Sequence, residues 1–302
     1  AIDAPDIRGK FLNDLASQML QDKEFDEMED LLALVQDPTT RSELVLQLMT
    51  YHARDREDPT TAADLFYSEQ VSLTPRFAQM GTFLQRYPLS LTASGLYDAG
   101  DIERGGELAD IVLELWSDDQ SDDRRLDAIL VGALARADQQ DRINMWAAAS
   151  SDPSHQFSVA IEAATARALA GLSVDRNDVS ATAGRLLPLI SDVSPPAPLW
   201  WKSNSPYPSP RSDAVVALRR LDVAIIQGLA EHGSLDQARQ AFAEIQQSPP
   251  YPYQAQLALA DAETTAGLPD AAHGQRLAVM DMVLAGQIDS TEMPDIILSL
   301  HP

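Results

Sequence analysis

The feature that most restricts the fold of this chain is a short break in its hydrophobic pattern that returns at nearly regular intervals. The breaks fall near Lys23, Glu57, Gly100, Asp138, Leu172, Gly233 and Gly267. Most intervals are about 35 residues, which is typical of helix-turn-helix repeats. Two intervals are longer, because one contains an extra break at Tyr87-Pro88 and the other contains a loop at 191–211. The spacing predicts a row of helical hairpins.

Between the breaks, apolar residues recur with the period of an α-helix. Leu44, Val45, Leu48 and Met49 form one such stripe, and Pro59 stands where a first-turn proline belongs. Further helices are expected at about 75–86, 89–99, 102–116, 123–137, 141–149, 156–171, 177–190, 212–232, 235–247, 252–266, 270–285 and 291–300. Ala and Leu dominate the chain and suit packed helices, while runs typical of strands are missing. We therefore expect an all-α fold with at least twelve helices and no sheet.

Several of these breaks share a six-residue pattern. It occurs in 23–28, 100–105 and 233–238, and its first and last positions occur in 267–272. The first residue leaves one helix, often in the left-handed conformation that glycine tolerates. The third can place an apolar side chain between the paired helices, and the sixth is usually small, which lets the two backbones approach closely. Acidic residues between them favour the N-terminus of the next helix.

The run from Gly233 to Phe242, followed by Pro250, resembles the second half of a tetratricopeptide repeat. Its small residue Ala238, the aromatic residue four positions later and the closing proline stand where that family places them. Ala272 and Gly105 keep the small position without the aromatic residue. The resemblance implies a right-handed α-solenoid of about seven stacked helix hairpins, with residues 1–302 as one helical-repeat domain.

The net charge of the chain limits the classes of partner that it can bind. Acidic residues outnumber basic ones by 46 to 22, which gives a formal net charge of −24. Nucleic acids and anionic membrane surfaces both require a concentrated basic surface, and the sequence shows none. No apolar run approaches the roughly 20 residues of a spanning helix, so we expect no membrane insertion. The negative charge itself has two explanations, solubility or a dedicated site for a basic partner.

No segment carries a specific catalytic signature, and we expect neither a cofactor nor a metal site. The chain has no cysteine, which excludes disulfides and thiolate chemistry. The five histidines are scattered, without the spacing of a zinc-binding helix. Gly105-Gly106 lacks the preceding strand and the lysine of a phosphate loop, so we interpret it as a site of close helix packing.

The segment 191–211 is the candidate site. It contains six of the 19 prolines and two of the four tryptophans. Such long connections are uncommon in compact domains and are often functional. Its aromatic side chains either pack over the solenoid or edge a groove that contacts a peptide or a sugar. The candidate ligand-binding residues are Trp200, Trp201, Lys202, Asn204, Tyr207 and Arg211.

Two classes of function stay open from the sequence. The first is a non-catalytic scaffold or adaptor that binds a peptide or protein on the solenoid surface. The alternative is an all-helical carbohydrate-binding protein or carbohydrate-active enzyme of the cell envelope, built as an α/α toroid. The polar start at Ala1 fits a mature end left by signal-peptide removal or an arbitrary boundary. We expect a periplasmic or secreted protein, and otherwise a cytoplasmic one.

Overall fold

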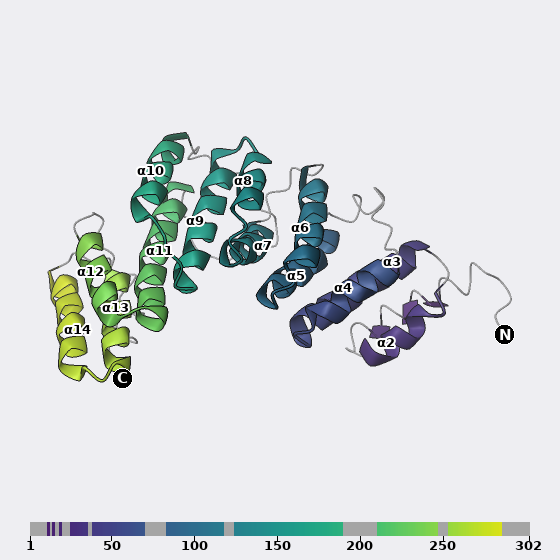
Figure 1. The fold of residues 1–302 in the computed structure, drawn as a ribbon, viewed down its shortest axis with the longest axis horizontal. Helices are drawn as coiled ribbons and strands as arrows, with labels where there is room; N and C mark the ends of the chain where they lie inside the picture. The colour runs from purple at the N-terminus through teal and green to yellow at the C-terminus, as the bar shows by residue number, and fades with distance from the viewer. Residues whose placement is uncertain are drawn as a thin grey trace. The chain divides into compact units, whose positions relative to one another are not determined.

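The computed structural model describes residues 11–12, 14–15, 18–19, 25–35, 38–69, 83–117, 124–189, 210–246 and 253–285. Every regular element in these ranges is helical, and thirteen are α-helices (Figure 1). Their bounds are α2 Phe25–Leu32, α3 Pro38–Thr50, α4 Pro59–Ser68, α5 Phe83–Asp98, α6 Ile102–Ser117, α7 Arg124–Arg136, α8 Gln140–Ala148, α9 Pro153–Leu169, α10 Arg176–Leu186, α11 Pro210–His232, α12 Leu235–Ile245, α13 Tyr253–Thr265 and α14 Pro269–Leu284. A π-helical turn, η1 (Tyr51–Asp55), extends α3, and a 3-10 turn, η3 (Leu187–Leu189), extends α10. The expected all-α fold is confirmed for the described ranges.

The chain divides into two compact units, Ala1–Ser150 and Ser151–Pro302. In the first unit the helices that follow one another as hairpins are α3/α4, α5/α6 and α7/α8, and in the second they are α9/α10, α11/α12 and α13/α14. The two helices of each hairpin contact one another. None of the described helices combines the length and the apolar character that crossing a lipid bilayer requires. One continuous repeat domain over 1–302 stays a prediction.

Four of these hairpins close with the same kind of turn. A residue with positive φ follows the first helix, and two backbone hydrogen bonds return from the turn to the helix end, as in a Schellman motif. The left-handed residues of these turns are Gly100, Asp138, Gly171 and Gly267. After α5, for example, the Asp101 amide donates to the Leu96 carbonyl over 2.8 Å. The breaks predicted at Glu57, Gly100, Asp138 and Gly267 are confirmed, because each of these residues has positive φ. The break predicted near Leu172 is at Gly171, one residue earlier.

The turn between α11 and α12 differs from the prediction. Gly233 does not adopt positive φ; instead Ser234 caps α12. The Ser234 hydroxyl accepts the Gln237 amide over 3.2 Å, and the Gln237 side chain accepts the Ser234 amide over 3.0 Å. This reciprocal capping box fixes the start of α12, so the turn does not need a left-handed residue. Ala238 and Phe242 are buried, as the pattern of the turn predicts.

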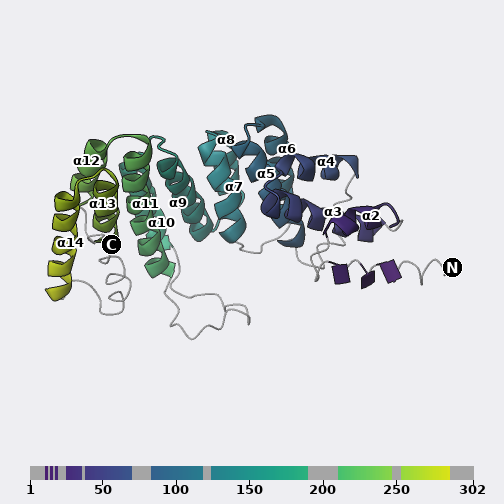
Figure 2. The same ribbon diagram turned by 90° about the horizontal axis from the view of Figure 1, so that it is seen from below.

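Within the first unit, α5 is the central helix. It contacts α3, α4, α6 and α7 (Figure 2). Its residues Leu89, Ala93 and Leu96 are fully buried. The predicted helix break at Tyr87-Pro88 is wrong, because α5 continues through Pro88. A proline removes one intrahelical hydrogen bond. Packing against four helices compensates for that loss, since tertiary contacts supply most of the stability of a helix in a protein.

The six-residue pattern at 100–105 is confirmed at its last position and wrong at its third. A Cβ on Gly105 would lie 3.3 Å from the Ala93 carbonyl oxygen and from the Tyr97 ring, so the backbones of α5 and α6 approach closely here. Ile102 was expected between the helices, but it is 39% exposed. Because α6 begins at Ile102, this side chain leaves the first turn before the two helices converge.

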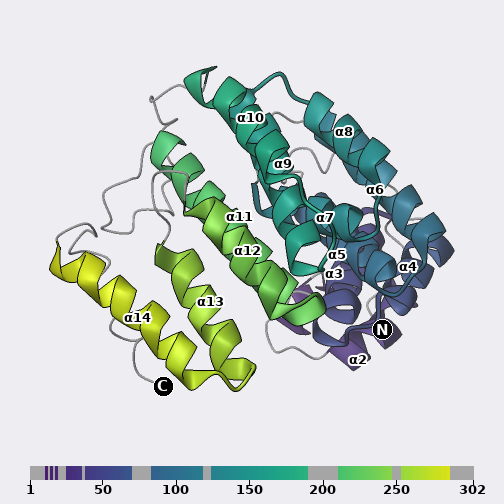
Figure 3. The same cartoon turned by 60° about the vertical axis from the view of Figure 1, so that its left-hand side comes forward.

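In the second unit, the first helices of successive hairpins contact one another. α9 contacts α11, and α11 contacts α13 (Figure 3). One core cluster contains Phe157, Ile161 and Leu221, and a second contains Phe242 and Leu259. The closest approach is at Gly228 of α11, where a Cβ would lie 1.7 Å from the Ala168 carbonyl oxygen. The backbones of α9 and α11 therefore touch at this point.

Arginine–carboxylate pairs join neighbouring hairpins in both units. The first unit has Arg104–Asp64, Arg136–Asp98 and Arg142–Asp110, and the second has Arg176–Asp222 and Arg239–Glu263. In every pair the two residues come from different hairpins. These pairs connect each hairpin to a neighbouring one, and their exposure ranges from the half-exposed Arg136–Asp98 pair to the buried Glu263 carboxylate.

Candidate functional site

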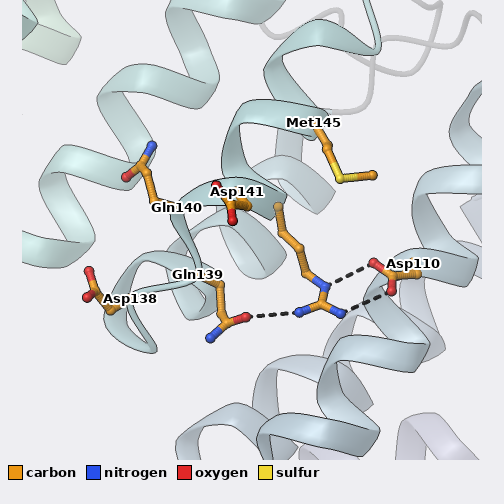
Figure 4. A pocket seen from close by; sticks show the side chains of 7 residues that line it. Asp110, Asp138, Gln139, Gln140, Asp141 and Met145 are labelled. Atoms are coloured by element: carbon orange, nitrogen blue, oxygen red, sulfur yellow. Dashed lines mark hydrogen bonds and ion pairs between the residues drawn. The ribbon is translucent and has the colours of Figure 1, made fainter.

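A pocket of about 400 Å³ lies between α6 and the α7–α8 turn of the first unit (Figure 4). This α6–α8 pocket is lined by Asp110, Asp138, Gln139, Gln140, Asp141, Arg142 and Met145. Small-molecule pockets commonly have volumes of about 300 to 1,000 Å³. This pocket lies near the lower end of that range.

The floor of the pocket is a fixed arginine. The Arg142 guanidinium donates from Nε and Nη2 to the two oxygens of Asp110, over 2.9 and 3.1 Å. Its Nη1 donates to Gln139 Oε1 over 2.9 Å, and Figure 4 marks these bonds with dashed lines. Hydrogen bonding to Asp110 raises the pKa of Arg142, which keeps the guanidinium charged. A bidentate pair of this kind orients both groups.

Two local features of the sequence bring Arg142 to this position. Asp138 (φ 56°) ends α7 in a Schellman turn, which starts α8 at Gln140 and directs Arg142 towards α6. On α6, Gly106 leaves room for the guanidinium, because a Cβ there would lie 2.7 Å from Arg142 Nη2. The interpretation of Gly105-Gly106 as close packing is confirmed.

Tyr97 of α5 packs against Gly105 of α6, one residue from the Gly106 that makes room for Arg142. Its ring contacts the Gly105 position, and its side chain is buried. Burial raises the pKa of Tyr97, while the nearby Arg142 opposes that rise. The Asp110 side chain is 50% exposed and lines the pocket.

The lining of the pocket gives it a negative character. The lining contains the three carboxylates of Asp110, Asp138 and Asp141 and one guanidinium, which is paired with Asp110. Asp138 and Asp141 add two further negative charges at the rim, both on exposed residues. Met145, which is 54% exposed, adds an apolar surface. The lining therefore combines carboxylates and amides with one apolar side chain.

The π-helical turn η1 is a second polar cluster in this unit. Such turns are rare and often mark functional sites. Here, however, the polar groups bind one another: His52 Nε2 lies 2.8 Å from Glu29 Oε1, and Arg56 Nε donates to the Tyr51 hydroxyl over 2.6 Å. The turn leads to Asp58, whose pKa is lowered because it accepts the Thr61 amide as the cap of α4. We therefore assign this cluster to the packing of η1 between α3 and α4 and to its contact with α2 through Glu29.

The structure does not test the site predicted from the sequence. Trp200, Trp201, Lys202, Asn204 and Tyr207 lie outside the described residues. Arg211 lies in the first turn of α11. That site stays a prediction. The residues of the α6–α8 pocket were missed by the sequence analysis, which identified only the turn at Asp138. The one feature of the sequence that points to them is the pair Gly105-Gly106. It indicates a close contact but does not identify the group that makes the contact.

No protein-family model, no curated protein and no solved structure matches this chain.

Proposed function

We propose that this protein is a non-catalytic scaffold that binds a peptide or protein on the surface of stacked helical hairpins. In this proposal the chain is a right-handed α-solenoid of about seven hairpins, similar to tetratricopeptide repeats. Six of these are the hairpins described above.

The observation that carries the proposal is the packing of first helices against first helices. In the first unit α3 contacts α5 and α5 contacts α7; in the second α9, α11 and α13 do the same. This order gives each unit a continuous face of parallel rows of side chains, and repeat proteins use such faces to bind extended partners. The shared Schellman turns set a common geometry from one hairpin to the next.

We also propose that the loop at 191–211 makes a second contact with the partner. Trp200, Trp201 and Tyr207 would offer flat apolar faces with polar edges, which suit either a peptide or a sugar. The toroidal carbohydrate-active alternative is kept as an outcome of the experiment, because no described residue favours it.

Display of random peptides tests the proposal directly. We expect selection on the immobilised full chain to enrich peptides that share a motif, and the enriched synthetic peptides to bind in solution with micromolar dissociation constants. Free energies of that order are typical of transient peptide recognition, at about −8 kcal/mol. A glycan array screened in parallel is the counter-test. Binding to glycans without enrichment of any peptide would contradict the scaffold and support the carbohydrate-binding alternative.

A further inference from the structure

We draw no further inference here: the strongest candidate, the exposed apolar stripe of Leu277, Met280 and Leu284 along α14, is an open helix face, and nothing in the described part of the structure shows what covers it.

Discussion

Replacing Gly228 with alanine is expected to destabilise the second unit by about 3 kcal/mol or more, which is the upper end of the cost of overpacking. The added Cβ would lie 1.7 Å from the Ala168 carbonyl oxygen and 2.7 Å from its carbonyl carbon. Both atoms belong to the backbone of α9, so no side chain can rotate away. Helices α9 and α11 must separate, which opens the core around Phe157 and Leu221. Thermal unfolding followed by circular dichroism measures the loss.

Gly184→Ala is the control for this prediction. Gly184 lies inside α10, and a Cβ there would meet no heavy atom within 4 Å. Alanine has the higher helix propensity, by about 1 kcal/mol, so this variant should unfold at the same or a slightly higher temperature. If Gly228→Ala behaved in the same way as the control, the contact between α9 and α11 would be wrong.

Replacing Arg239 with alanine is expected to cost about 3 to 5 kcal/mol, because it leaves a buried charge without its partner. Arg239 of α12 donates to Glu263 Oε1 of α13 from Nε over 2.8 Å, and its second nitrogen lies 2.7 Å from the same oxygen. Glu263 is only 1% exposed. Removing the guanidinium therefore leaves a buried carboxylate without the cation that it is paired with here. Adding Glu263→Gln to Arg239→Ala should recover most of the loss.

Arg136→Ala provides the matched comparison. Arg136 pairs with Asp98 over 2.8 Å, but both side chains are well exposed, at 39% and 51%. Exposed pairs contribute about 1 kcal/mol or less. Urea unfolding of the two arginine variants should thus give clearly different free energies of unfolding. Similar values for Arg136→Ala and Arg239→Ala would show that burial does not set the strength of these pairs.

Much of the fold follows from local chemistry that the sequence displays. The turns at Gly100, Asp138 and Gly267 could be predicted, because each ends a helix with a residue that tolerates positive φ. The sequence around Pro88 could not show that α5 continues through the proline, since the helices that pack against α5 come from other parts of the sequence. The sequence did not indicate the role of Gly228. A glycine inside a helix only lowers helix propensity until the residue that it contacts on the neighbouring helix is known.

The candidate site was beyond sequence reasoning for the same reason. Arg142 and Asp110 are 32 positions apart, and nothing in either segment marks them as partners. The pair forms only because the Asp138 turn directs α8 onto α6 and Gly106 leaves space for the guanidinium. Patterns of composition instead emphasised the loop at 191–211, which lies largely outside the described residues.

Hydrogen–deuterium exchange of the full chain, with and without a saturating peptide from the display selection, tests the central claim most directly. A ligand that binds the folded surface slows the exchange of the elements it contacts. The account predicts slower exchange in helices of at least two consecutive hairpins of one unit, with no change for a scrambled peptide. Unchanged exchange in every described helix at saturation would contradict a scaffold that binds its partner on stacked hairpins.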